Sequence, residues 1–175
     1  MKWFTADQHF GHKNIIEYCD RPFKTVEQMD EQLIYNHNFL VGPKDEVYHL
    51  GDFTMANTSM AKDYLDQLNG THYHITGNHD RKNMEQAGFS WSKDVYRLRT
   101  GLDRIWLSHY AHRVWPSKHY GDPHLFGHSH GMLPHHYGSL DVGVDCWGYG
   151  PISLNRVIQV IKERDEEVRC REISA

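Results

Sequence analysis

Five short motifs in the sequence contain residue types that bind metal ions and transfer protons. They are Asp7–Gln8–His9, Gly51–Asp52, Gly77–Asn78–His79–Asp80, Ser108–His109 and Gly127–His128–Ser129–His130. Together they offer carboxylate, imidazole and amide-carbonyl groups without a thiolate, a mixture that suits divalent manganese, iron, zinc, cobalt or nickel. Each motif alone is a weak signal, because a Gly-Asp pair is usually a turn. Their occurrence together in one short chain predicts a metal site.

Each motif directly follows a segment that the residue pattern predicts to be a strand. These strands are expected at residues 2–6, 46–50, 72–76, 104–108 and 124–126. In open α/β sheets, sites form outside the carboxyl ends of the strands. Residues two apart in an extended segment point to the same side, so Asp7 can face one ion together with His9. Glycines before the ligands allow the chain to turn sharply and to approach an ion closely.

The rest of the pattern alternates helices with strands. We expect helices at 26–40, 57–69, 82–88 and 153–164, strands at 94–99 and 140–144, and a weak edge strand at 167–173. Strands that alternate with helices indicate βαβ units in the first half, and the later run of strands indicates a second, more antiparallel sheet. The pattern predicts an α/β sandwich of two sheets with helices outside, as a single domain over residues 1–175.

The composition narrows the possible partners. Lys and Arg number 19 and Asp and Glu number 23, so the net charge is −4, which argues against a general nucleic-acid coat or a polybasic membrane binder. No apolar stretch approaches the roughly 20 residues of a membrane span. The first residues lack the apolar region of a signal peptide, and we expect a cytoplasmic protein. Cys19, Cys146 and Cys170 lie outside every motif and suggest neither a disulfide framework nor a thiolate zinc site.

Histidine is unusually frequent, with 15 in 175 residues. Five lie in the motifs, and most of the other ten are expected to be ordinary polar residues. His37 is predicted to be solvent-exposed on a helix. Three histidines in or beside predicted strands are expected to pack or form hydrogen bonds: His49, His72 and His74. His12 and His112 each follow a motif histidine by three residues, which makes them candidate substrate contacts at the rim of the site.

The order of the motifs resembles that of the calcineurin-like metallophosphoesterase superfamily. The sequences around the motifs, YHLGDF, ITGNHD and LFGHSH, are similar to those of its small bacterial and phage members. The resemblance spans residues 7–130, and no ligand position of the family pattern is missing. The resemblance implies a four-layer αββα sandwich of two mixed sheets flanked by helices, with a dinuclear metal site at the strand ends. It implies these ligands: Asp7, His9 and His130 for one divalent ion, Asn78, His109 and His128 for the other, and Asp52 as the bridge.

The resemblance also implies hydrolysis of a phosphate ester. Two metal ions can share one solvent molecule and lower its pKa to about 7, and the resulting hydroxide would attack phosphorus. His79 would act beside the substrate as general acid, and Asp80 would orient it. Arg81 is the best-placed cation for a substrate phosphate, with a surface salt bridge as the alternative. Asp145 is a candidate outer partner of the ligands, although no spacing requires it.

The sequence favours a phosphodiester over a phosphomonoester and leaves the substrate itself open, with a nucleotide as one candidate. A phosphomonoesterase or a nuclease of the same superfamily is an alternative. A nuclease would need a basic groove, for which Arg97, Arg99 and Arg104 are local candidates. A non-catalytic metal-binding scaffold is less favoured, because such a protein has no reason to keep His79. The oligomeric state has no signature in the sequence.

Overall fold

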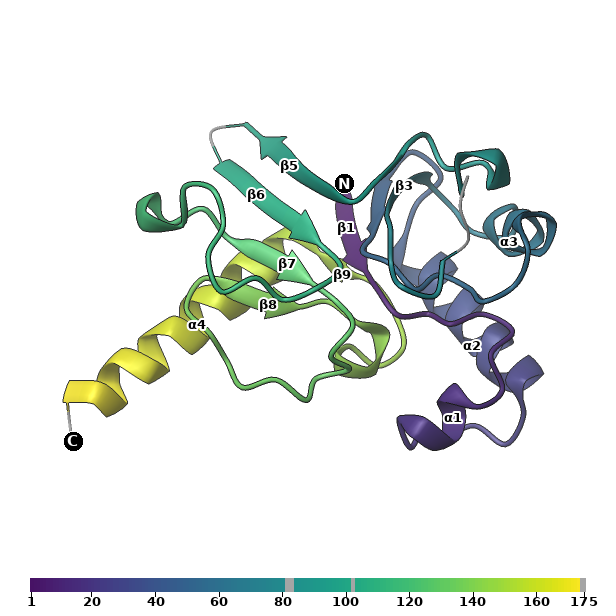
Figure 1. Cartoon of the computed structure of the whole chain (residues 1–175), viewed down its shortest axis with the longest axis horizontal. Helices are drawn as coiled ribbons and strands as arrows, with labels where there is room; N and C mark the ends of the chain where they lie inside the picture. Colours follow the sequence, from purple (N-terminus) through teal and green to yellow (C-terminus); the bar gives the residue numbers. More distant parts are fainter. Residues whose placement is uncertain (81–83, 102, 174–175) are drawn as a thin grey trace.

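The computed structural model of the chain describes residues 1–80, 84–101 and 103–173. Two mixed β-sheets pack against each other through a shared apolar core, as the sequence predicts (Figure 1). The first sheet has the order β4-β3-β2-β1-β9 and consists of β1 (Lys2–Thr5), β2 (Glu46–His49), β3 (Thr71–Ile75), β4 (Ser92–Lys93) and β9 (Ile152–Ser153). Its pairs are parallel except β1 with β9.

The second sheet has the order β5-β6-β7-β8. Its strands are β5 (Val95–Thr100), β6 (Asp103–Ser108), β7 (His124–Phe126) and β8 (Ser139–Asp141). Only β5 and β6 pair antiparallel, whereas β6, β7 and β8 run parallel. The expectation of a more antiparallel second sheet therefore holds for a single pair. The parallel arrangement brings the carboxyl ends of β6 and β7 to one edge.

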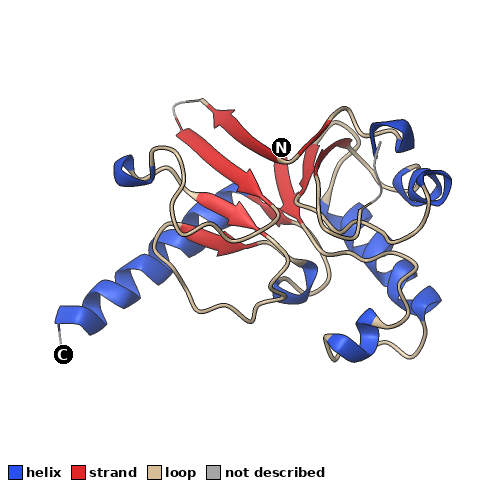
Figure 2. Ribbon diagram, in the orientation of Figure 1, coloured by secondary structure: helices blue, strands red, loops and turns tan. Residues whose placement is uncertain are grey.

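The helices surround these sheets (Figure 2). They are α1 (Ile15–Tyr18), α2 (Val26–Leu40), α3 (Thr58–Leu65) and α4 (Leu154–Ile173), with 3₁₀ turns η1 (Met84–Ala87), η2 (Lys118–Tyr120) and η3 (Val144–Cys146). Thr25 and Asn57 cap α2 and α3 by accepting hydrogen bonds from backbone N–H groups of the first turn. None of the described helices is both long enough and apolar enough to cross a membrane.

The prediction of an edge strand at 167–173 is wrong, because α4 continues through this segment. The segment is rich in Glu and Arg, which favour a helix, and its weak alternation of apolar residues does not outweigh that preference. The helix contacts β1 and β9 of the first sheet and β8 of the second. Its buried residues Val157 and Val160 join the core between the sheets. The C-terminal helix thus helps to fix the two sheets relative to each other.

Two apolar clusters stabilise this arrangement. The first lies between the sheets and includes Phe4 and Leu50 from one side and Leu107 and Leu125 from the other. The second lies on the opposite face of the first sheet, beneath α1, α2 and α3, and includes Phe53. Both clusters hold residues next to the motifs, so the loops that carry the predicted ligands begin from well-packed strand ends.

Several histidines outside the motifs belong to the interior. His49, His72 and His74 are buried, and His49 Nε2 lies 3.0 Å from His72 Nδ1, which confirms the expectation of packing and hydrogen bonding. The expectation of an exposed His37 is wrong. This residue is buried on the inner face of α2, with Nε2 2.8 Å from the Asn69 carbonyl oxygen and its ring near that of His72.

His124 on β7 is completely buried and lies between two hydroxyl groups. Ser108 Oγ donates its proton to the Tyr110 carbonyl oxygen, so it accepts a hydrogen bond from His124 Nε2 at 2.8 Å. His124 Nδ1 is then the acceptor for Ser139 Oγ at 3.0 Å. Burial disfavours the charged ring and lowers the pKa of His124 to about 3.

Acid should therefore destabilise the fold through His124. The unfolded chain protonates this ring near pH 6.5 and the folded chain only near pH 3, so stability falls as the pH drops through this window. Between pH 7 and pH 4, the free energy of unfolding should fall by about 3 kcal/mol more in the wild type than in His124→Gln. Urea unfolding in EDTA measures this, with exposed His119→Gln as the control. Equal pH slopes for wild type and His124→Gln would contradict the prediction.

Candidate metal centre

The five motifs converge where the two sheets meet. The loops after β1, β2 and β3 come from the first sheet, and those after β6 and β7 come from the second. Direct hydrogen bonds join loops of different sheets. The His128 backbone N–H donates to Asp7 Oδ2 at 2.9 Å, and His109 Nδ1 lies 2.8 Å from the Leu50 carbonyl oxygen. The shared edge of both sheets therefore forms one site.

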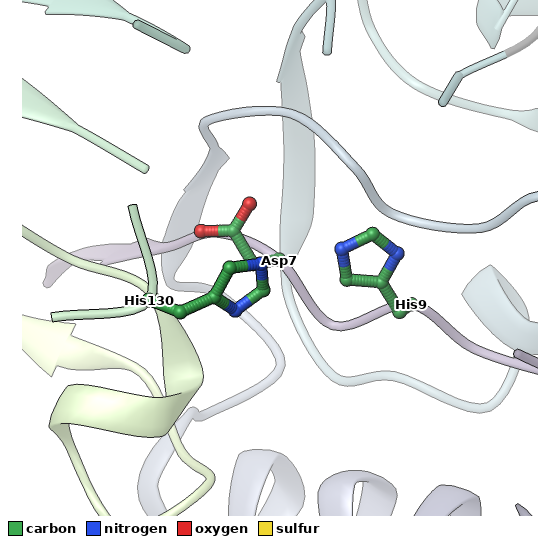
Figure 3. A group of neighbouring side chains, drawn as sticks. All are labelled: Asp7, His9 and His130. Carbon is green, nitrogen blue, oxygen red and sulfur yellow. The ribbon is translucent and has the colours of Figure 1, made fainter. Parts of the chain in front are cut away.

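One group of candidate ligands consists of Asp7, His9 and His130, whose ligand atoms lie within 4.8 Å of one another. Figure 3 shows the His130 ring beside the Asp7 carboxylate, with the His9 ring across from them. The His9 and His130 rings stack with their centroids 5.5 Å apart. His9 Nε2 is buried and has no hydrogen-bond partner among the described residues, which leaves its lone pair available to a cation.

The second group consists of Asp52, His109 and His128, again within 4.8 Å of one another. Asn78 belongs to the same cluster, because its Oδ1 lies 3.0 Å from His109 Nε2. The Tyr110 hydroxyl also donates to this oxygen at 3.3 Å.

Asp52 lies between the two groups. Its Oδ2 atom is 3.6 Å from His9 Nε2 and 3.5 Å from His109 Nε2. Its Oδ1 atom accepts the His79 backbone N–H at 2.9 Å. The structure thus brings all seven predicted ligands together, with Asp52 between the two groups.

Burial favours the neutral form of two groups in this cluster, His9 and Asp7. Burial lowers the pKa of His9 to about 3, so at neutral pH the ring is neutral and keeps a free lone pair. Burial raises the pKa of Asp7 to about 7, despite the nearby His130 and the His128 backbone N–H. A nearby cation would favour the charged carboxylate. Carboxylate, amide and imidazole groups fit divalent transition-metal ions.

Five of the seven predicted ligands have a left-handed backbone. Positive φ angles between 46° and 66° occur at Asp7, His9, Asp52, His128 and His130. Residues with a Cβ rarely adopt this conformation, and it costs of order 1–3 kcal/mol each. It turns each loop sharply after its strand, so that successive ligands face the same centre. Such strain gathered in one place is typical of a functional site.

Two motif glycines provide space for ligand side chains. A Cβ built on Gly77 would lie 2.2 Å from Asp52 Oδ1 and 2.3 Å from the Asp52 backbone nitrogen. A Cβ on Gly51, whose φ is +93°, would lie 2.4 Å from His109 Nδ1. Both contacts are far too short. The glycines therefore permit the close approach that the sequence predicts.

His79 and Asp80, the two predicted catalytic residues, lie in different surroundings. The His79 side chain is exposed at the rim, with its ring 5.3 Å from that of His9. Asp80 is not its orienting partner, so this expectation needs correction. Four other donors saturate the Asp80 carboxylate: the backbone N–H groups of Asp52, Phe53 and Gly77, and the ring of His74. Asp80 thus joins the loop after β3 to the loop after β2.

His12 and His112, two of the predicted substrate contacts, lie at different positions around the site. The His12 ring lies 5.4 Å from that of His9 and 6.2 Å from that of His79, so it lines the rim. His112 accepts a hydrogen bond from Trp106 Nε1 at 3.0 Å and lines a pocket together with Asn78. Arg81 lies outside the described residues.

Arg21 is the residue that sequence reasoning missed. Its guanidinium is fully buried and forms two 2.8 Å hydrogen bonds to the carboxylate of Asp145. It also donates to the carbonyl oxygens of Asp7 and Gln8 at 2.7 and 3.0 Å. Asp145 Oδ2 in turn lies 2.7 Å from His130 Nδ1, so the predicted outer partner does reach the ligands. No motif surrounds Arg21, and its partner is 124 residues away, so the sequence carries no signal for it.

The chain has relatives among known proteins, and these relatives indicate its family. No family model matches the chain. The uncharacterized protein MJ1445 of Methanocaldococcus jannaschii is 31% identical over 163 residues, which cover 92% of this chain and 91% of that protein. The chain therefore belongs to the same family as this archaeal protein.

Two further similarities agree with this placement. The gene 66 protein of Mycobacterium phage L5 is 26% identical over 200 residues, covering 94% of this chain and 96% of its own length. The crystal structure of AQ665 from Aquifex aeolicus, a protein of unknown function, superposes with a TM-score of 0.71. That protein is 26% identical, and the superposition covers 92% of this chain and 99% of the other.

The substitution Gly77→Ala tests whether the close approach of this loop holds Asp52 in place. The added methyl group should displace the carboxylate and destabilise the fold by about 1–3 kcal/mol. It should also abolish most of the rise in melting temperature that Mn²⁺ produces in the wild type, because ion binding stabilises the folded state. The control is Gly42→Ala, whose Cβ would make an ordinary 3.6 Å contact. A wild-type response of Gly77→Ala to Mn²⁺ would contradict this account.

Proposed function

We propose that the protein is a dinuclear metal-dependent phosphoesterase with a preference for phosphodiesters. The observation that carries the proposal is the position of the Asp52 carboxylate between His9 and His109, at 3.6 and 3.5 Å. One ion would be held by Asp7, His9 and His130, and the other by Asn78, His109 and His128. When bound, two divalent ions supply a water nucleophile at neutral pH and neutralise phosphoryl oxygens.

The chain's own residues would position the substrate and handle the proton. His79 is exposed at the rim next to the cluster, so its ring can reach the leaving oxygen of a bound ester and donate a proton to it. The hydrogen bond from the His79 backbone to Asp52 fixes its loop against the predicted bridge. His12 lies beside both His9 and His79, so its side chain can assist in holding the substrate.

The rim of the site supports the preference for diesters. Asn78, His79 and His128 are all exposed, so both substituents of a diester can extend into solvent or along the surface. A nuclease is less supported, because Arg97 of the candidate basic patch is paired with Asp122 at 2.8 Å. This pairing reduces the charge available to a nucleic-acid backbone.

Turnover of two model substrates tests the proposal directly. Purified protein loaded with Mn²⁺, Ni²⁺, Co²⁺ or Zn²⁺ should hydrolyse bis(p-nitrophenyl) phosphate, and more efficiently than p-nitrophenyl phosphate. Protein treated with EDTA should be inactive. Absence of hydrolysis with every metal, in protein shown to contain the ions, would favour the non-catalytic scaffold. Activity on the monoester alone would overturn the diester preference.

Two substitutions separate the proton donor from the metal ligands. His79→Ala should retain both ions and lose 10²–10⁴-fold in turnover, as is typical when a general acid is removed. Asp52→Asn should lose ions as well as activity, because an amide is a poor bridge between two cations. Metal content by mass spectrometry and steady-state rates measure the two effects, with exposed His119→Ala as the control. A fully active His79→Ala would show that this ring is not the acid.

A further inference from the structure

A large cavity adjoins the candidate metal centre and extends away from it. It has a volume of about 790 Å³ and begins at His130 and Asp145. From there it extends over Phe126, Ser139 and Asp141 on the second sheet. Leu125 and Leu140, the neighbours of these residues, point into the core between the sheets. The cavity therefore lies on the outer face of β7 and β8.

A loop lies along this face of the second sheet. The segment between β7 and β8 crosses below the two strands as a long loop (Figure 2). Its residues 131 and 133–136 form one wall of the cavity, with Leu133 and Pro134 as the apolar part. A volume of this size matches the roughly 300–1,000 Å³ of sites for small organic ligands.

The polar lining favours an anion. Arg113 and Arg164 line the cavity and are both exposed. Among the described residues, the arginine ion pairs are formed by others: Arg21, Arg97 and Arg156. The two acidic groups of the lining are already engaged, since Asp145 pairs with Arg21 and Asp141 accepts hydrogen bonds from Ser129 Oγ and the Gly131 N–H. Asp141 keeps its negative charge, but Arg113 and Arg164 together outweigh it, so the lining has a net positive charge.

We propose that this cavity binds a second phosphate group of the substrate, one that the enzyme does not cleave. The substrate class is then a small phosphodiester that carries a further phosphate group on the same organic body, and a nucleoside bisphosphate serves as a binding probe for it. The scissile group would lie at the metal centre, the organic body against Leu133 and Pro134, and the second phosphate at Arg113 and Arg164. This inference rests on the proposed phosphoesterase function.

Calorimetric titration of the Mn²⁺-loaded protein tests the inference without requiring turnover. Adenosine 3′,5′-bisphosphate should bind at least about ten-fold more tightly than adenosine 5′-monophosphate, because two charge-assisted contacts are added. The double variant Arg113→Gln/Arg164→Gln should remove this difference and leave the affinity for the monophosphate unchanged. The control Arg99→Gln/Arg104→Gln makes the same change of charge on exposed positions of β5 and β6 and should keep the difference.

The arms of this experiment separate the possible results. Equal affinity for both nucleotides in the wild type, or a difference that survives in Arg113→Gln/Arg164→Gln, would overturn the proposal. Weaker binding of inorganic phosphate by that variant would also overturn it, because the arginines would then serve the scissile group. Tighter binding of a single-stranded oligonucleotide than of the bisphosphate would point to a nucleic-acid substrate instead. A binding difference in a protein that hydrolyses nothing would contradict only the proposed catalysis.

Discussion

The position of Asp52 is the constraint on which the rest of the structure depends. Its buried carboxylate faces His9 and His109, which follow strands of different sheets. For the three side chains to meet, the carboxyl ends of β1, β2 and β6 must share one edge. The apolar core between the sheets fixes that edge, because Leu50 and Leu107 pack there immediately before the Gly51–Asp52 and Ser108–His109 motifs. The packing of the two sheets therefore also positions the side chains of the candidate metal centre.

Assembling this cluster has a clear energetic cost. Five ligand positions adopt the left-handed backbone, and two carboxylates are buried among imidazoles. Removing a charge from water without compensation is expensive, and the protein supplies compensation around the cluster. Arg21 fixes the carbonyl oxygens of Asp7 and Gln8 and, through Asp145, the His130 ring. Two divalent ions would provide the remaining compensation for the carboxylates at the centre.

Sequence and structure agree where a local pattern determines the outcome. The helix at 26–40 and the strand at 124–126 occur where the sequence predicts them, because apolar spacing and capping are local signals. The motifs also indicate which loops converge, since parallel strands place their ends at one edge. The contacts of Arg21, Asp80 and His37 were missed or wrongly expected. Each depends on partners distant in the sequence or on which face of an element is buried, which tertiary packing alone decides.

Anomalous diffraction from crystals grown with Mn²⁺ tests the central claim most directly, because it locates the ions without reference to any substrate. The account predicts two peaks on either side of Asp52, about 3.5–4 Å apart as in other two-metal sites. One peak should lie among Asp7, His9 and His130, and the other among Asn78, His109 and His128. A single peak, or peaks away from the Asp52 carboxylate in crystals saturated with the ion, would contradict the dinuclear centre.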